Sequence, residues 1–432
     1  MELSLWMTAL ENSLKLVLGT TTIAVLIGLL TSLAAWRSGC AAGRLLPLLS
    51  LAVPPYIFVY CLSEISDYLS PWSASIGVLG LCNSAFIHAP LTSFLSRQGD
   101  SIYEAAFVAT GSRPRSLLHV LRPALSSALP LGAAIVACEA LSDLAVSRYY
   151  GIQSLVVMSF TFWSASISLT NIIPGLAFIG VLGLLFSIFG KRFKTVPFAA
   201  RQRVSRPFYA IMACLPASTV IGFCVGVLMH WMPQARSTSF PQLLGEIGNS
   251  GILVAIATLG CSALALLMVV LGVSRHFVRI SLFLYGIPAL VLAALLLPMS
   301  RWLPYLFLLG IAIFLRFSCL MVVNMDSSMQ SHQKLQEMLT ATCNSKTRLL
   351  HQLRLYSPGF VSGICLVSLD VLRELPMSML LQPFNFTTLA MRVYYLSATE
   401  MLSSIAPEAI VLFSISLLVT IILAGVQHAF TA

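Results

Sequence analysis

The chain has 432 residues, of which 58% are hydrophobic and only 9% are charged. This composition excludes an ordinary soluble domain, in which about a quarter of the residues carry a charge. The formal net charge of +10 raises nucleic acid or anionic lipid as partners, but basic loops that set membrane topology explain it better. We therefore expect a protein of the lipid bilayer with no nucleic-acid partner.

Apolar segments long enough to cross the roughly 30 Å hydrocarbon layer, about 17 to 25 residues each, recur along the whole chain. Their continuous hydrophobicity predicts an all-α polytopic membrane protein with about 11 transmembrane helices. The candidates begin near Leu14, Leu45, Ile76, Leu125, Ile172, Phe208, Gly251, Ser281, Leu303, Phe360 and Ala406.

Lysine and arginine are concentrated in alternate connections between these segments, the pattern that orients membrane proteins. Arg37 and Arg44 lie in the first connection, whereas Glu64 and Asp67 lie in the next one. If the basic connections are cytoplasmic, the N-terminus is outside and the C-terminus is inside. The first eleven residues contain two acids and no basic residue, so we expect the first segment to be retained as an anchor rather than cleaved as a signal peptide.

The ten cysteines are scattered, mostly within apolar segments, and show no CxxC or Cys/His ligand spacing. They are expected to be small buried hydrophobic residues. No structural disulfide and no stable metal site are predicted.

The connection between the apolar segments that begin near Ile76 and Leu125 contains the sequence EAAFVATG, Glu104 to Gly111. Glu104 is predicted to begin a short helix, where a negative charge is favoured. Ala105 and Ala106 favour helix and let another surface approach closely. Gly111 can take the left-handed conformation that ends the helix. After it, Ser112 is a candidate cap for a second helix, which contains Arg113 and Arg115.

Two acids follow in the next apolar segment, Glu139 and Asp143, and two more occur late in the chain, Asp370 and Glu374. Each pair has i, i+4 spacing, which places both carboxylates on one helix face. Ionisable groups in membrane spans usually face a cavity or a partner.

Two interpretations of the acids are open. Either they pair with Arg148 and Arg373 and orient an outer gate, or they lie on a translocation path, where carboxylate oxygens suit a hard cation in transit. His88 and Asn83 are weaker candidates and are better explained as hydrogen-bond partners between helices.

Polar landmarks recur at nearly constant spacing and predict two related halves. Asn12-Ser13 matches Asn249-Ser250 at an offset of 237, and Pro55 matches Pro288 at 233. After residues 104–111 the offset is 231, so the offset decreases along the chain. At this offset Gly132 matches Gly363, Glu139 matches Asp370, and Asp143 matches Glu374. If the equivalent acids meet, four carboxylates lie near one pseudo-twofold axis.

The octapeptide also has a second copy, EMLTATCN, from Glu337 to Asn344. At an offset of 233, Glu104 matches Glu337, and Arg115 matches Arg348. Both copies fall on the predicted cytoplasmic side, so the repeats are parallel. Met338 and Leu339 replace the two alanines, and asparagine tolerates the left-handed conformation that glycine had. We expect the two copies to act unequally; changing Met338 and Leu339 to alanine should then not lower activity.

The EAA octapeptide resembles the loop through which importer permeases of the ABC class receive their ATPase. Two longer stretches, Val136 to Leu155 and Asp370 to Glu400, are similar to fused ferric-iron ABC importer permeases, most specifically in the run ELPMSMLLQPFNFTTLAMRVYY. The resemblance covers Glu11 to Val426. Three departures from the family are the short chain, the altered second loop and the segment Phe208 to Met229, which has no counterpart ahead of Asn12. Either the first half lacks its outermost helix, or the true start of the chain lies upstream.

The resemblance implies a bacterial inner-membrane permease that takes ferric iron from a periplasmic substrate-binding protein. It implies two copies of a separate ABC ATPase subunit that binds ATP and Mg, so this chain needs no cofactor. Residues 1–190 would form the first permease domain, 191–207 a basic cytoplasmic linker, and 208–432 the second domain. The implied ATPase-coupling residues are Glu104, Ala105, Ala106, Gly111, Arg113, Arg115, Glu337, Asn344 and Arg348.

No catalytic motif is present: the sequence contains no Walker A, HExxH, nucleophile-elbow or dinucleotide-binding pattern. We therefore expect no enzymatic activity from the chain itself. Three other functions are compatible with the sequence: a permease for another small solute such as thiamine or a phosphonate, an ion-gradient-driven secondary transporter, and a membrane scaffold that does not transport.

Overall fold

The computed structural model describes residues 2–38, 41–62, 69–166, 215–227, 239–271, 275–332, 335, 338, 345–399, 401 and 404–431. All regular secondary structure in these ranges is helical, with no strand. The linker 191–207 and the loop residues Glu337 and Asn344 lie outside the described residues.

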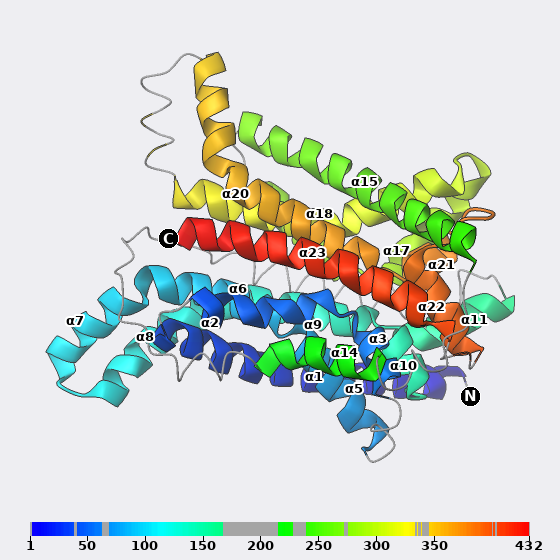
Figure 1. Ribbon diagram of the computed structural model, residues 1–432, viewed down its shortest axis with the longest axis horizontal. Coiled ribbons are helices and arrows are strands. Elements are labelled where there is room, and N and C mark those ends of the chain that lie inside the picture. The colour runs from blue at the N-terminus through cyan, green and yellow to red at the C-terminus, as the bar shows by residue number, and fades with distance from the viewer. Residues whose placement is uncertain are drawn as a thin grey trace.

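Helices of the N-terminal part run from one end of the molecule to the other and back (Figure 1). They are α1 (Glu2–Ser38), α2 (Ala41–Leu45), η1 (Leu46–Ala52), α3 (Pro55–Cys61), α5 (Pro71–Asn83), α6 (Ala85–Phe94), η2 (Leu95–Gly99), α7 (Asp100–Thr110), α8 (Arg113–Ser127), α9 (Leu129–Ser142), α10 (Ala145–Tyr149) and α11 (Leu155–Ser166).

Helices of the C-terminal part pack over them, with α15, α18 and α20 in the upper part of the view (Figure 1). This part comprises η5 (Leu215–Ala217), α14 (Ser218–Gly226), α15 (Phe240–Leu271), α16 (Arg275–Gly286), α17 (Ala289–Leu296), η8 (Leu297–Arg301), α18 (Tyr305–Ser331), α20 (Ser345–Leu372), α21 (Pro376–Leu380), α22 (Leu389–Ala398) and α23 (Ala406–Thr431).

Six described helices are long and apolar enough to cross a membrane, and three bent helix pairs raise the number to as many as 9. The described residues therefore have a helical, transmembrane-like architecture, which suggests a multi-pass membrane protein. The nine segments coincide with nine of the eleven predicted spans. The segment predicted near Ile172 lies outside the described residues, and only the short helix Leu215–Gly226 is described for the one near Phe208. The count of eleven is therefore not reached within the described part.

Two of the bends occur at prolines. The chain turns by 81° between η1 and α3, and by 94° between α16 and α17. Pro54 precedes α3, and Pro288 precedes α17. Proline lacks an N–H and disfavours helix in the residue before it, so a helix breaks there. Each break frees backbone carbonyls inside the bundle, and these need donors.

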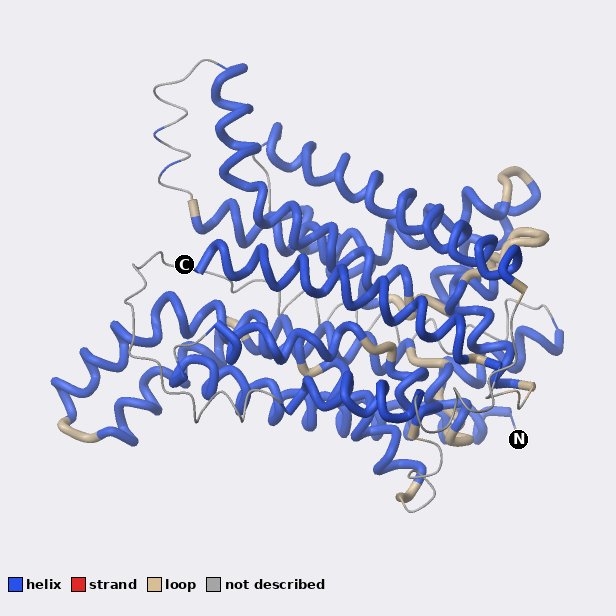
Figure 2. The backbone as a smooth tube through the Cα atoms, viewed as in Figure 1, coloured by secondary structure: helices blue, strands red, loops and turns tan. Residues whose placement is uncertain are grey.

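The long helices lie side by side along the bundle (Figure 2). The main hydrophobic core joins both parts of the chain, with Ile87 and Val136 from one and Phe317 and Met321 from the other. The N-terminal end of α1 and the C-terminal end of α23 lie at opposite ends (Figure 1). The α7–α8 pair projects at the same end as the last turns of α23, and the first turns of α20 project there too.

The contact between α1 and α5 resembles the contact between α15 and α18, except that the small and the large residue have exchanged helices. A Cβ on Gly19 would lie 2.6 Å from Ile76 Cδ1, and a Cβ on Gly310 would lie 2.9 Å from Ile256 Cγ2. Ile256 follows Gly19 by 237 residues, and Gly310 follows Ile76 by 234. Each contact therefore has one glycine and one isoleucine, on opposite helices.

A second contact between the same helices repeats the exchange. A Cβ on Gly80 would lie 2.6 Å from Ile23 Cγ2, whereas a Cβ on Gly260 would lie 3.0 Å from Phe314 Cδ2. The offsets are again 237 and 234. Close helix packing requires only that one partner be small, so exchanging the two residues preserves the contact.

Hydrogen bonds repeat at the same offsets. Asn12 Nδ2 donates to Gln153 O at 3.1 Å, and Asn249 Nδ2 donates to Thr387 O at 3.0 Å. Ser13 Oγ accepts from Leu155 N at 2.8 Å, and Ser250 Oγ accepts from Leu389 N at 3.0 Å. The asparagine–serine pairs are 237 residues apart and their partners 234 apart. The predicted steady decrease in offset is thus wrong, because the offset is 231 at Asp143 and Glu374 and rises to 234 after them.

Candidate functional site

Two features of the structure are candidate sites, and the first is the projecting α7–α8 hairpin. Gly111 has φ 61°, the left-handed conformation that was predicted, and its N–H donates to Phe107 O at 2.8 Å. Thr110 Oγ1 donates to Ala106 O at 2.7 Å, and Ser116 Oγ donates to Ser112 O at 2.8 Å. These bonds give the turn a defined shape.

The base of the hairpin is fixed to α1. Trp36 Nε1 donates to Asp100 Oδ1 at 3.0 Å, and the Arg37 guanidinium lies 4.8 Å from the centre of the Tyr103 ring. At the tip, by contrast, α7 has no buried residue, and Val108 is 87% exposed. The hairpin is therefore a shaped projection on a fixed base.

Two local predictions about this hairpin are wrong. The helix containing Glu104 begins at Asp100, because the preceding chain from Leu95 is already helical and continues into it. Ser112 occupies the cap position of α8, but its side chain makes no capping hydrogen bond. Pro114 in the first turn has no N–H to cap. Of the second copy, Arg348 lies in the first turn of α20.

The second candidate site is a cavity of about 70 Å³ inside the bundle. All four predicted acids line it, two from each part of the chain, together with two arginines. The lining residues are Pro55, Tyr56, Leu79, Asn83, Glu139, Ser142, Asp143, Leu144, Ala145, Arg316, Phe317, Asp370, Arg373, Glu374, Leu375 and Pro376.

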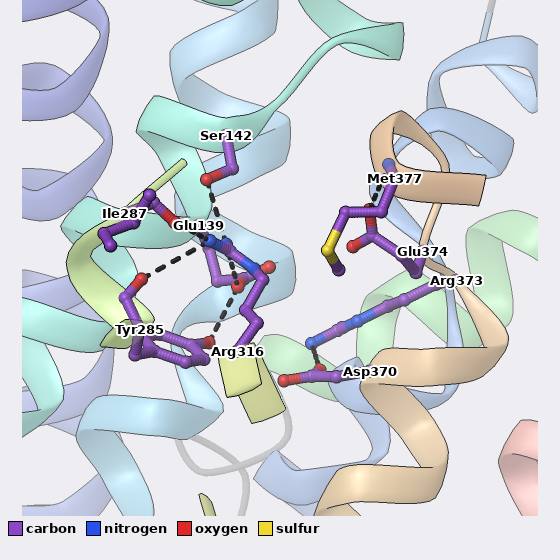
Figure 3. A network of polar contacts seen from close by, with 9 residues as sticks. All are labelled: Glu139, Ser142, Tyr285, Ile287, Arg316, Asp370, Arg373, Glu374 and Met377. Carbon is purple, nitrogen blue, oxygen red and sulfur yellow. Dashed lines mark hydrogen bonds and ion pairs between the residues drawn. The ribbon is translucent and has the colours of Figure 1, made fainter. Parts of the chain in front are cut away.

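Arg316 connects the two parts of the chain across this cavity (Figure 3). It comes from α18, and its side chain is 1% exposed. Its Nη2 atom donates to Ser142 Oγ at 2.9 Å and lies 3.4 Å from Glu139 Oε1. The same carboxylate oxygen accepts from Tyr285 Oη at 2.7 Å. Glu139 and Ser142 are at the end of α9, so the contact joins α9 to α16 and α18.

Arg316 also donates hydrogen bonds to backbone carbonyls at the break between α16 and α17. Its Nη1 atom donates to Ile287 O at 2.7 Å and to Tyr285 O at 3.4 Å. These carbonyls have no helical partner, because the chain turns by 94° there. The Arg316 side chain thus contacts both the α16–α17 break and Glu139.

Asp370 has a different arrangement. It pairs with Arg373, three residues later and just past the end of helix α20 (Figure 3). The Arg373 guanidinium lies 5.6 Å from the centre of the Phe86 ring on α6. The carboxylate atom Asp370 Oδ2 has no hydrogen-bond partner and is buried. This pair is local, in contrast to that of Glu139.

The other two acids lie just past the ends of α9 and α20 and hold the next short helix. Asp143 accepts from the Ser147 N–H at 2.8 Å and from its hydroxyl at 3.0 Å. Glu374 accepts from the Met377 N–H at 3.0 Å. A carboxylate at the start of a helix satisfies N–H groups that have no other partner. The two short helices, α10 and α21, are offset by the same 231 residues as their acids.

The predicted pairing with Arg148 is wrong, whereas that with Arg373 is confirmed for Asp370. Arg148 lies 5.7 Å from the Phe160 ring centre. Glu139 is paired with Arg316, which sequence reasoning missed together with Tyr285. An arginine within an apolar span is itself a signal of a functional group.

His88 and Asn83 are both buried. Thr31 Oγ1 lies 3.0 Å from His88 Nδ1, and Arg44 O lies 3.1 Å from Nε2. These contacts join α6 to α1 and α2, as expected for a hydrogen-bond partner between helices. Asn83 lines the acidic cavity.

A further buried charge group was not predicted. Arg392 Nε on α22 lies 3.6 Å from Glu246 Oε1 on α15 and 4.0 Å from Glu408 Oε1 on α23. The two glutamates are 4% and 0% exposed. Residues at the matching offsets in the N-terminal part are Ala9 for Glu246 and Met158 for Arg392, so this group belongs to one part only.

The cavity is lined by more acidic than basic side chains. Four carboxylates face two guanidinium groups. Among the described residues, no group of three or more His, Cys, Asp or Glu side chains is placed to hold a metal ion. The seven cysteines that the structure describes are free thiols.

Comparison of the sequence with protein-family models and with curated proteins found no match, and comparison with solved structures found none either.

Proposed function

We propose that this chain is the permease subunit of an ATP-driven ABC importer of the bacterial inner membrane. Its cargo would be ferric iron delivered by a periplasmic binding protein, and two copies of a separate ATPase would bind ATP and Mg. Two parallel permease repeats would be fused in one chain. The proposal rests on the sequence resemblance of the octapeptide and of the segment after Asp370, to which the structure adds physical support.

The observation that carries the proposal is the α7–α8 hairpin. A docking element must project, keep its shape and be joined firmly to the membrane helices that it moves. The hairpin has these three properties: its tip is exposed, Gly111 fixes its turn, and Trp36 and Arg37 hold its base to α1. Ala105 and Ala106 lie on α7 close to this turn.

The repeat is supported by contacts that recur at matching offsets. The asparagine and serine hydrogen bonds, the broken helices before α3 and α17, and the exchanged glycine–isoleucine contacts all follow the same alignment. Unrelated apolar helices have no reason to share such polar and steric detail. On this proposal the acidic cavity lies between the repeats and forms the outer gate or part of the path.

Gly111→Ala tests the coupling role of the hairpin. Nothing lies within 4 Å of the added Cβ, but an L-residue in the left-handed region costs roughly 1–2 kcal/mol. We expect the variant to fold and to show several-fold lower stimulation of the partner ATPase by this permease in nanodiscs. Gly248→Ala is the matched control, because it also has nothing within 4 Å and lies in helix α15. Equal stimulation by both variants would contradict the coupling role.

An ion-gradient-driven carrier is the second candidate, and one observation favours it. Four carboxylates around one internal cavity are the kind of group that binds and releases protons or cations in such carriers. Uptake that continues without ATP and stops when the ion gradient is collapsed would identify this mechanism.

A further inference from the structure

The helix that leads into the α7–α8 hairpin contains a π turn. Helix α6 continues through η2, the π-helical segment Leu95–Gly99, into α7, which leaves the bundle (Figure 1). The hydrogen bonds of a π turn span one residue more than those of an α-helix, and such turns are rare and frequent at functional sites. In the C-terminal part, α18 is α-helical along its whole length, from Tyr305 to Ser331.

Two glycine contacts align the helices just before this turn. A Cβ on Gly132 would lie 3.2 Å from Ile87 Cα, and a Cβ on Gly363 would lie 3.1 Å from Met321 Cα. The glycines match each other at the predicted offset of 231, so Ile87 and Met321 occupy equivalent places. Their offset is 234, the same as for the earlier contacts of α5 and α18.

After this contact the two parts differ in length by one residue. Glu104 and Glu337 match at an offset of 233 rather than 234. The N-terminal part therefore has one residue more between Ile87 and Glu104 than the C-terminal part has in the matching stretch. The π turn lies in this interval and contains one extra residue, so it accounts for the difference.

The extra residue determines which side of α7 faces α1. One residue of α-helix corresponds to about 100° of rotation. With the π turn in place, Trp36 Nε1 donates to Asp100 Oδ1 at 3.0 Å, and the Arg37 guanidinium lies 4.8 Å from the centre of the Tyr103 ring. Gly99 permits the approach, since a Cβ there would lie 2.7 Å from Trp36 Nε1.

The residues that make these contacts occur in the N-terminal part only. The matching residues, at offsets of 237 for α1 and 233 for α7, are Val273 for Trp36, Ser274 for Arg37, Gln333 for Asp100 and Gln336 for Tyr103. None of the four matching residues has an indole, guanidinium, carboxylate or phenol group. The inserted residue and the contacts that it permits thus belong to the same part of the chain.

We propose that the π turn is a positioning element for the α7–α8 hairpin. Its extra residue turns α7 so that Asp100 and Tyr103 bind α1, and this holds the exposed Glu104 and Ala105 in one orientation. An insertion without a role is tolerated best in an exposed turn, whereas this one lies inside a helix and changes its hydrogen bonding. The effect of the π turn on coupling rests on the proposed function; its effect on the contacts with α1 does not.

Deletion of Ser96 tests the proposal, because it removes one residue from the turn and costs only the local bond from Ser96 Oγ to Ser93 O. The full chain would be labelled with fluorotryptophan, purified in detergent and studied by fluorine NMR, with Trp36→Phe to identify the Trp36 signal. We expect the deletion to shift this signal in the same direction as Asp100→Ala does, because α7 then follows α6 as an α-helix and turns Asp100 away. The remaining tryptophan signals report whether the fold is retained.

Ser96→Ala is the matched control, since it keeps the length of the turn. The Trp36 signal should stay in place in this variant, and also when the Ser96 deletion is combined with an alanine inserted after Gln98. An unshifted Trp36 signal in the folded deletion variant would overturn the proposal. If the deletion unfolds the chain, Gly99→Ala replaces it: its methyl group must separate α7 from Trp36, so an unshifted signal there would overturn the proposal as well.

Stimulation of the partner ATPase in nanodiscs distinguishes this proposal from the proposed function. It should fall several-fold in the Ser96 deletion and recover when the alanine is inserted, which a loss of stability alone would not explain. A shifted Trp36 signal with full stimulation would contradict the coupling role of the hairpin, whereas the positioning of α7 by the π turn would stand.

Discussion

Glu139 and Asp370 occupy matching positions on the cavity, yet their counter-charges come from different places. Arg316 reaches Glu139 from α18, across the two parts of the chain, whereas Arg373 reaches Asp370 from just past the end of α20, three residues along the chain. The positions that match these arginines hold Cys82 for Arg316 and Ser142 for Arg373. Each acid keeps one guanidinium, but only the first pair ties the two parts together.

Both acids have a neutralising guanidinium, but only the Glu139–Arg316 pair links the two parts of the chain. Neutralising a carboxylate in this cavity therefore does not require a link between the parts. Opening the cavity between the two parts must break the contacts of Arg316 with Glu139 and Ser142, whereas the Asp370–Arg373 pair can move as a unit with α20. Any opening of the cavity would then be unequal, with most of the resistance on the Glu139 side.

Removing Arg316 has the largest expected effect. Arg316→Gln leaves Glu139 without its counter-charge and the carbonyls of Tyr285 and Ile287 without their charged donor. Loss of one member of a buried ion pair costs about 3–5 kcal/mol. Hydrogen exchange of the variant should rise both at the end of α9 and at the α16–α17 break.

Arg373→Gln is the comparison for that experiment, because its partner Asp370 is only three residues away along the chain. Its exchange should rise at the end of α20 and in α21, with the α16–α17 break still protected. If both variants loosened the same segments, the two pairs would not differ as the geometry indicates.

Relocating the guanidinium sharpens the comparison. The double variant Ser142→Arg/Arg316→Cys gives the Glu139 side the residues of the Asp370 side. It should recover about 1–2 kcal/mol of the loss in Arg316→Gln, since a buried carboxylate regains a charged hydrogen-bond partner. The carbonyls at the α16–α17 break stay without a donor, so their exchange should remain fast in measurements of the same peptides. Protection of that break in the double variant would argue that Arg316 does not hold it.

The exchanged glycine contacts test whether the two parts share one packing plan. In Gly19→Ile, the new side chain meets Ile76, and overpacking costs roughly 1–3 kcal/mol. Adding Ile76→Gly reproduces the Ile256–Gly310 contact and should restore most of the thermal stability. Denaturation midpoints in detergent of the two single variants and the double variant give the coupling energy directly. Additive losses would contradict matched packing.

Much of the architecture could be predicted because it depends on local properties. Between six and nine candidate spans in the described residues follow from apolar length alone, and the left-handed Gly111 follows from a glycine after a helix-forming run. The four acids line one cavity, as expected if the matching positions of the two predicted repeats lie near one pseudo-twofold axis. The Asn12 and Asn249 landmarks proved to make equivalent hydrogen bonds.

What could not be predicted depends on tertiary contact. The partner of Arg316 is 177 residues away, and nothing in the local sequence distinguishes Glu139 from Asp370 as its target. Tyr285 was missed because a tyrosine in an apolar run usually only packs there. The Gly19–Ile76 match was hidden for a different reason: exchanging the small and large residue preserves the contact while it removes the sequence similarity.

Uptake of radiolabelled ferric iron into proteoliposomes is the measurement that tests the proposed function most directly. The vesicles would contain this chain and its ATPase, with the iron-loaded binding protein outside, and would be compared with and without internal ATP and with ion gradients collapsed. We expect uptake that requires ATP, persists without a gradient and falls several-fold in Gly111→Ala. Uptake that is independent of ATP but driven by a gradient would contradict it.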